Sequence, residues 1–154
     1  MKRKMKYEEL YAHCYNMAEK LKNKEFDEII AVSRGGLTAA HILGKMLKLE
    51  VGIFNTKTEE ILTINEHATK FLIVEDLVAQ GRTLKIIEEA FSPFRWEFYA
   101  TVIDSSYTNY KYHYSLITDE WIVFPYEDFD AVKENDRGLF RFKTDSYGEL
   151  KCLT

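Results

Sequence analysis

The chain has 154 residues, of which 46% are hydrophobic and 14% aromatic, so its length suits one domain with a packed core. The formal net charge of −4 and the pI of about 5.6 give no basic face of the kind that binds nucleic acid, so we expect no nucleic-acid partner. No apolar run is long enough to cross a bilayer, which argues against a membrane partner.

The cysteines and the first residues indicate a compartment. Cys14 and Cys152 are far apart in the sequence and lack metal-ligand spacing, which favours free thiols in a reducing environment. The basic first ten residues are not followed by the apolar segment of a secretory signal. We therefore expect a cytoplasmic protein.

The N-terminal part is predicted to form a helix from about Tyr7 to Asn23. Its apolar residues recur at helical spacing and define the expected buried face: Tyr7, Leu10, Tyr11, Cys14, Met17 and Leu21. We expect this helix, residues 1–25, to support a core of about residues 26–130, with a C-terminal extension at 131–154. The whole chain would then be a single domain.

A first candidate anion site follows residues 28–32, EIIAV, which read as a short buried strand. The sequence then turns sharply at Ser33-Arg34-Gly35-Gly36, and residues 38–48 have a helical pattern. Paired glycines allow backbone amides to face an anion, and Arg34 adds positive charge. An ordinary tight turn between strand and helix is the alternative.

The next segment combines a predicted strand, residues 49–54, with a polar stretch at residues 55–70. A weak alternation of apolar residues lies around Ile61, and Lys57 and Lys70 supply positive charge. Lys57 is a candidate for an anion contact, and a solvated surface lysine is the alternative.

The central motif is residues 71–84, FLIVEDLVAQGRTL. The run at residues 71–74 is typical of a strand buried on both faces of a parallel sheet. A tight loop at residues 79–83 then leads into a helix predicted for residues 84–91, and such a helix start favours a bound phosphate. Glu75 and Asp76, just before the loop, can accept hydrogen bonds from a sugar diol or lie beside Mg²⁺ bound to phosphates. The motif therefore indicates a phosphorylated sugar with a metal.

The C-terminal half supplies two further predicted strands, residues 97–103 and 115–118. Asp104 ends the first of them, and a loop rich in tyrosine follows at residues 105–114. The apolar segment WIVFPY, residues 121–126, comes next. The tail, residues 136–154, has the pattern of an edge strand or of a partner contact.

These motifs resemble a family, the type I phosphoribosyltransferases. Residues 74–83, VEDLVAQGRT, resemble its binding loop for 5-phosphoribosyl-1-pyrophosphate. IIAVSRGGL, at residues 29–37, resembles the pyrophosphate loop of the 6-oxopurine branch, especially the bacterial xanthine-guanine enzymes, and WIVFPY resembles its base-binding segment. The resemblance implies a single-domain α/β fold: a mainly parallel twisted sheet flanked by helices, with ligand loops at the C-terminal strand ends and a short hood at residues 55–70.

The resemblance also implies an Mg²⁺-dependent enzyme that transfers the phosphoribosyl group to a nucleobase and releases pyrophosphate, and it implies a homo-oligomer. Catalytic roles fall on Glu75 and Asp76, which would hold the ribose hydroxyls, with Asp76 next to the metal. The remaining expected contacts are Ala79, Gln80, Gly81, Arg82 and Thr83 for the 5-phosphate, Ser33, Arg34, Gly35, Gly36 and Lys57 for the pyrophosphate, and Trp121, Ile122 and Asp104 for the base. Trp121 would stack on the base and the Ile122 backbone would read its edge.

Two residues depart from the pattern of the 6-oxopurine enzymes. Ala79 stands where those enzymes have an aspartate that takes the purine proton, and a positioned base of that kind contributes about 10²–10⁴-fold in rate. Asp104 stands where they have a lysine that donates to the exocyclic oxygen. A carboxylate only accepts, so Asp104 favours a ring amino group or N–H over a carbonyl.

Three functions therefore stay open. The chain is a phosphoribosyltransferase for guanine, xanthine or hypoxanthine; or it performs the same reaction on adenine or another amino-substituted base; or it is a non-catalytic sensor of the donor or of a nucleotide. The tyrosines between Tyr107 and Tyr114 look exposed in the sequence and are candidates for an oligomer contact.

Overall fold

The computed structural model describes residues 1–129, 141–144 and 150–153. The elements run in the order β1 (Lys2–Lys4), α1 (Tyr7–Leu21), β2 (Glu28–Ser33), α2 (Leu37–Leu47), β3 (Val51–Asn55), β4 (Glu60–Leu62), β5 (Lys70–Val78), α3 (Arg82–Ala90), β6 (Arg95–Asp104), β7 (His113–Thr118), β8 (Trp121–Val123), the 3-10 turn η1 (Pro125–Glu127), β9 (Arg141–Thr144) and β10 (Leu150–Leu153).

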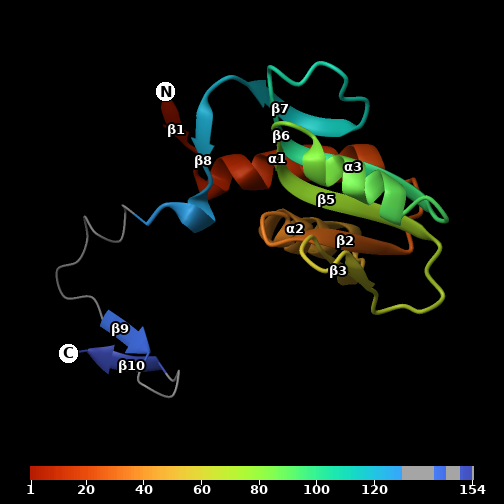
Figure 1. The fold of residues 1–154 in the computed structure, drawn as a ribbon, viewed down its shortest axis with the longest axis horizontal. Coiled ribbons are helices and arrows are strands. Elements are labelled where there is room, and N and C mark those ends of the chain that lie inside the picture. Colours follow the sequence, from red (N-terminus) through yellow and green to blue (C-terminus); the bar gives the residue numbers. More distant parts are fainter. Residues whose placement is uncertain (130–140, 145–149, 154) are drawn as a thin grey trace.

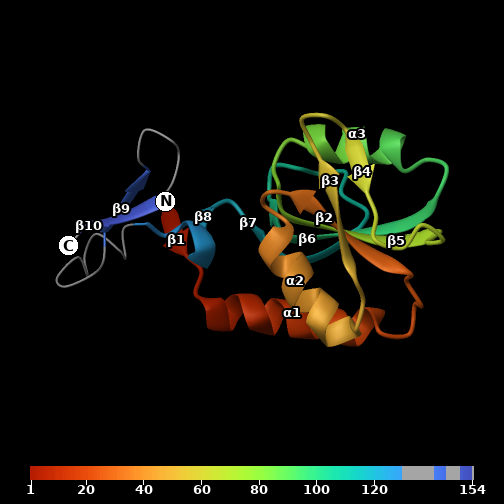
Figure 2. The same cartoon turned by 90° about the horizontal axis from the view of Figure 1, so that it is seen from below.

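The centre of the fold is a six-stranded sheet with the order β4-β3-β2-β5-β6-β7. All neighbours in it are parallel except β3 and β4. Helices α1 and α2 cover one face of the sheet and α3 covers the other (Figures 1 and 2). This arrangement confirms the predicted α/β class with a mainly parallel sheet.

Each face of the sheet has its own apolar core, because successive strand residues point to opposite sides. Leu72 and Val74 of β5 pack with α1 and α2, while Phe71 and Ile73 pack with α3. Burial on both faces explains why β2 and β5 have unbroken apolar runs. It also places β5, and the acids at its end, in the middle of the molecule.

The central strand extends further than the sequence predicts. We expected its apolar run to end at Val74, but β5 continues to Val78, and its residues 77 and 78 are still paired with β6. Helix α3 begins at Arg82, two residues before the expected start. Glu75 and Asp76 therefore lie in a strand and not in a loop.

The N-terminal residues form an unexpected strand. β1 pairs in parallel with β8, with Arg3 opposite Ile122, and these two strands form a small sheet of their own (Figure 1). The sequence KRK gives no apolar alternation from which a strand could be predicted. Its pairing is set by β8, more than one hundred residues away.

The predicted hood contains a hairpin and an anchored return. β3 and β4 pair antiparallel, with Asn55 opposite Glu60. Beyond them, the fully buried Glu28 of β2 accepts hydrogen bonds from the backbone N–H groups of Ile64 (3.1 Å) and Asn65 (2.9 Å). A carboxylate without access to water thus fixes the return of this segment to the sheet.

Two expectations about tyrosine exposure were wrong in part, although Tyr114 is 44% exposed as expected. Tyr107, Tyr110 and Tyr112 are partly buried and pack against the core under α3, because the loop at residues 105–112 folds back over Phe98 of β6. Conversely, Tyr7 and Tyr11 of α1 lie on the solvent side, 43% and 49% exposed, and the helix buries Leu10, Cys14, Met17, Ala18 and Leu21 instead.

In the C-terminal part, β9 and β10 pair antiparallel with each other. The other tail residues, and the division proposed at residue 131, lie outside the described ranges. Within the described ranges, Cys14 is buried and free, and no helix has the length and apolar character needed to span a membrane.

Candidate active site

The C-terminal ends of the parallel strands β2, β5 and β6 meet at one edge of the sheet, where ligand loops of open α/β folds cluster. Three cavities lie around this edge, and together they contain nearly all of the residues that the sequence singled out.

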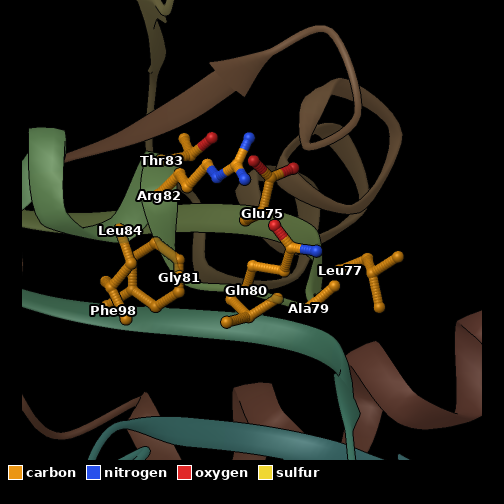
Figure 3. A pocket seen from close by; sticks show the side chains of 10 residues that line it. Glu75, Leu77, Ala79, Gln80, Gly81, Arg82, Thr83, Leu84 and Phe98 are labelled. Atoms are coloured by element: carbon orange, nitrogen blue, oxygen red, sulfur yellow. The ribbon is translucent and has the colours of Figure 1, made fainter. Parts of the chain in front are cut away.

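The first cavity, of about 260 Å³, is formed by the loop between β5 and α3. Its lining includes Glu75, the loop at residues 79–83 and, from β6, Phe98 (Figure 3). Gly81 has a positive φ of 77°, which a residue with a side chain rarely adopts. The N–H of Lys85 makes the first intrahelical bond of α3, to the Gly81 carbonyl at 3.0 Å, so the amides of residues 82–84 precede the helical ladder. The loop therefore has the donors and dipole that suit a phosphate.

The second cavity, of about 500 Å³, joins the β2–α2 turn to the hood. Ser33, Arg34 and Gly35 line it from one side, and Asn55, Thr56 and Lys57 from the other. The Ser33–Arg34 peptide bond is cis. The structure thus brings Lys57 and Arg34 to the same space, although 23 positions separate them in the sequence. Two cationic side chains around a cavity suit an anion such as pyrophosphate.

The β2–α2 turn has room only for glycine at residues 35 and 36, because neighbouring atoms lie too close for a Cβ. A Cβ on Gly36 would lie 2.1 Å from the carbonyl oxygen of Val74, and one on Gly35 would lie 2.5 Å from Oδ1 of Asp76. The β2–α2 turn therefore packs directly against β5, and Asp76 lies next to the turn. Gly36 is therefore required for close packing of the turn on β5, and Gly35 leaves room for the Asp76 carboxylate.

The third cavity, of about 230 Å³, lies on the other side of the β5 end. Asp76, Ala79 and Asp104 line it together with Trp121 and Ile122. Trp121 is 69% exposed, so its ring is at the surface and free to stack on a ligand. All three predicted base contacts are thereby brought to one space.

Asp104 is an ionised acceptor in this cavity. Its Oδ1 accepts hydrogen bonds from the backbone N–H (2.9 Å) and the hydroxyl (2.7 Å) of Ser106. These hydrogen bonds hold the pKa of Asp104 below its ordinary value. A carboxylate in this position can accept a hydrogen bond from a ligand but cannot donate one.

The two acids at the end of β5 have different environments. Glu75 faces the first cavity and Asp76 faces the third, because the side chains of adjacent strand residues point to opposite sides. Burial and the negative charge of Asp76 raise the pKa of Glu75 to about 9. The N–H of Asp76 donates to Oε1 of Glu75 at 2.9 Å. Burial beside Asp76 therefore favours the protonated form of Glu75 in the free protein.

The donor set fits Mg²⁺ only in part. Within the described ranges, no group of three or more His, Cys, Asp or Glu residues could enclose a metal. Mg²⁺, however, is commonly bound through one or two carboxylates plus the phosphates of a substrate and water. Asp76, which lies against Gly35 of the second cavity, matches that second mode.

Sequence reasoning missed several residues that line the cavities, such as Phe98, and also Tyr126 beside Asp76. Tyr126, which lies in the WIVFPY segment but had no assigned role, donates its hydroxyl to Oδ2 of Asp76 at 2.9 Å. No local pattern indicates this contact, because fifty positions separate the two residues. The only available signal was the turn that Pro125 starts after β8, which directs the following residue back toward the sheet.

Known proteins show the same fold. No family model matches the chain. A curated xanthine-guanine phosphoribosyltransferase from Idiomarina loihiensis is 29% identical over 136 residues, which cover 79% of this chain and 84% of that protein. The crystal structure of a purine phosphoribosyltransferase from Pyrococcus horikoshii has a TM-score of 0.68 and 26% identity, covering 83% of this chain and 95% of that one. A hypothetical protein from Neisseria gonorrhoeae with bound ppGpp has a TM-score of 0.66 at 17% identity, covering 89% and 96%, and shows likeness of fold alone.

The fold defines the class: the chain has the type I phosphoribosyltransferase fold, and the loops predicted to bind ligands lie at the C-terminal strand ends. Within that class, the resemblance to the purine phosphoribosyltransferases is confirmed.

Proposed function

We propose that this chain transfers the phosphoribosyl group of 5-phosphoribosyl-1-pyrophosphate to a purine base and releases pyrophosphate, with Mg²⁺ as cofactor. One observation carries the proposal. Glu75 lines the first cavity and Asp76 lines the third, and Asp76 also lies against Gly35 of the second cavity. A donor with its ribose at the acids would reach all three with its 5-phosphate, its pyrophosphate and its anomeric carbon.

The chain's residues divide the work of binding. Backbone amides at the start of α3 and the Thr83 hydroxyl hold the 5-phosphate, while the Ser33–Gly36 turn, with Arg34 and Lys57, receives the pyrophosphate. Glu75 and Asp76 hold the ribose hydroxyls. The Trp121 ring stacks on the base and aligns its nitrogen, which is catalysis mainly by positioning.

In the reaction, a ring nitrogen of the base forms a bond to the anomeric carbon as the bond from that carbon to the pyrophosphate oxygen breaks. The electrons of the broken bond leave with pyrophosphate, and positive charge develops on the sugar. Bound Mg²⁺ would supply charge neutralisation for the leaving pyrophosphate. Ala79 has no proton acceptor, so the proton of the base leaves to water or to pyrophosphate and not to this position.

The resemblance favours guanine, xanthine or hypoxanthine as the base. The curated relative from Idiomarina loihiensis is a xanthine-guanine enzyme, and the turn at residues 29–37 resembles the pyrophosphate loop of that branch. A 6-oxopurine is therefore the first substrate to test.

A second candidate substrate is adenine or another amino-substituted ring. It is favoured by Asp104, whose carboxylate lines the third cavity and is held ionised by Ser106. An exocyclic amino group facing Asp104 gains a charge-assisted hydrogen bond. A carbonyl group there would place its oxygen against a carboxylate oxygen with no proton between them.

The test is pyrophosphate release with Mg²⁺ and the donor against guanine, xanthine, hypoxanthine, adenine and pyrimidine bases. Asp76→Asn removes the charge at the centre of the site, and Asp119→Asn, at an exposed position that lines none of these cavities, is the matched control. We expect turnover that survives in Asp119→Asn and is lost in Asp76→Asn.

The substrate pattern then separates the alternatives. Turnover on 6-oxopurines supports the first candidate, and turnover restricted to amino-substituted bases supports the second. Donor or nucleotide binding without turnover on any base would make the chain a sensor. If the unmodified chain shows no binding and no turnover, the proposed function is contradicted altogether.

A further inference from the structure

Tyr126 joins three segments of the site through one hydroxyl group. Besides its 2.9 Å hydrogen bond to Oδ2 of Asp76, the hydroxyl lies 3.2 Å from the carbonyl oxygen of Gly35. Both partners are acceptors, so the single hydroxyl proton is shared between them. The contact thus connects the end of β5, the β2–α2 turn and the segment that follows the base-binding strand β8.

The ring of Tyr126 is fixed independently of any ligand. It stacks on Phe124 with ring centroids 5.5 Å apart and planes 11° apart. The turn that contains it is closed by Glu127, whose Oε1 accepts the backbone N–H of Phe124 at 3.1 Å. The next residue, Asp128, pairs with Lys4 of β1 at 3.3 Å. Tyr126 is therefore held by its own scaffold.

The hydroxyl of Tyr126 is the donor in this contact, because an ionised carboxylate only accepts hydrogen bonds. It engages only one of the two carboxylate oxygens of Asp76, and Asp76 still lines the third cavity. The hydroxyl group therefore orients the Asp76 carboxylate and leaves it accessible to a ligand.

We propose that Tyr126 is a positioning residue for the phosphoribosyl donor: its hydroxyl holds the Asp76 carboxylate and the Gly35 carbonyl in a fixed relation to the base-binding segment. The inference rests on the proposed function, because it assigns the donor to Asp76 and to the Ser33–Gly36 turn. It adds a residue that couples the base side of the site to the donor side.

The test compares Tyr126→Phe with Tyr99→Phe in the full chain. Tyr99 is the control, since it belongs to the apolar cluster against which Tyr126 packs, its hydroxyl makes one side-chain hydrogen bond, to Ser115 at 2.7 Å, and it lines none of the three cavities. The readouts are the KM values for donor and base, the donor Kd by calorimetry with Mg²⁺, and the melting temperature. We expect Tyr126→Phe to raise the KM and Kd for the donor by about tenfold, the size of a lost hydrogen bond to a charged group, with the KM for the base changed less than about twofold.

The outcomes are distinguishable. A merely structural Tyr126 would lower the melting temperature as Tyr99→Phe does and leave the donor constants unchanged, and that result overturns the inference alone. Tighter donor binding in Tyr126→Phe would show that the hydroxyl obstructs Asp76, which also overturns it. If the unmodified chain binds no donor, the proposed function fails and this inference fails with it.

Discussion

The backbone N–H of Trp121 donates a hydrogen bond to the carbonyl oxygen of Met1 at 2.8 Å, and two residues further the carbonyl of Val123 accepts the N–H of Met5 at 2.9 Å. In a parallel pair with this register, Trp121 and Val123 direct their backbone groups toward β1. The N–H and C=O of Ile122 therefore point to the opposite, unpaired edge of β8. This is the orientation that a backbone reader of a base requires.

The first prediction concerns this pairing. In the same register, the N–H of Arg3 points to β8 and that of Lys2 points away, so Arg3→Pro removes a ladder donor while Lys2→Pro does not. We expect Arg3→Pro to raise the KM for the base about three- to tenfold, the cost of one hydrogen bond, with little change for the donor. Steady-state kinetics of both variants, with Arg3→Ala to account for the Arg3–Glu9 ion pair, provide the measurement. Equal constants in Arg3→Pro and Lys2→Pro would contradict the role given to β1.

The second prediction separates the two glycines of the β2–α2 turn. A methyl group on Gly36 meets backbone atoms of β5 and β2, which cannot move aside, so Gly36→Ala should lower the free energy of unfolding by about 1–3 kcal/mol. A methyl group on Gly35 meets the Asp76 carboxylate, which can rotate away. Gly35→Ala should therefore fold nearly as well but bind the donor more weakly. Its turnover should also fall, because a 1 Å misplacement costs up to about 10²-fold in rate.

Urea unfolding and donor titration of the two variants test this contrast. Each variant serves as the control of the other. The reverse ranking, with Gly35→Ala the less stable and Gly36→Ala the weaker binder, would show that the positions have been assigned wrongly.

The third prediction concerns Asp104. Asp104→Lys replaces an acceptor by a donor in the third cavity, so we expect the ratio of kcat/KM for a 6-oxopurine to that for adenine to rise at least about tenfold. Asp119→Lys makes the same change of charge at an exposed position outside the cavity. A ratio that moves equally in both variants would mean that Asp104 acts through long-range charge and does not contact the base.

The fourth prediction is a pH dependence of stability caused by Glu75. Its pKa is raised from 4.5 to about 9 in the folded chain, so the folded state binds the proton more tightly than the unfolded state. The contribution is therefore fully favourable below pH 4.5 and is lost as the pH rises toward 9, with a slope of at most about 1.4 kcal/mol per pH unit. In metal-free buffer, the free energy of unfolding should decline over this window and the decline should be smaller in Glu75→Gln. Glu66→Gln, whose side chain is 88% exposed, should follow the unmodified chain.

The fifth prediction tests the anchor of the hood. In Glu28→Gln the side-chain NH₂ group faces a backbone N–H of Ile64 or Asn65, and an unsatisfied buried donor costs about 1–3 kcal/mol. Hydrogen exchange of these two amides should accelerate more than that of the β2 amides. Uniform acceleration throughout the sheet would instead indicate a global loss of stability.

The sequence by itself determined the α/β class and the strand, loop and helix order around both candidate anion sites. These features are local: an apolar run of strand length, a glycine that permits a tight turn, and a helix start that leaves amides free all lie within about fifteen neighbouring residues. Even there, the exact end of β5 was missed, because pairing with β6 extends the strand through two acids that have little preference for it.

Tertiary structure decided everything that depends on distant pairs. Only the fold brings Lys57 beside Arg34, pairs residues 2–4 with residues 121–123, and turns Tyr107, Tyr110 and Tyr112 inward. It also places the Tyr126 hydroxyl against Asp76. Such contacts depend on how the sheet and its loops are packed, and no periodicity in the chain encodes a hydrogen bond between residues fifty positions apart.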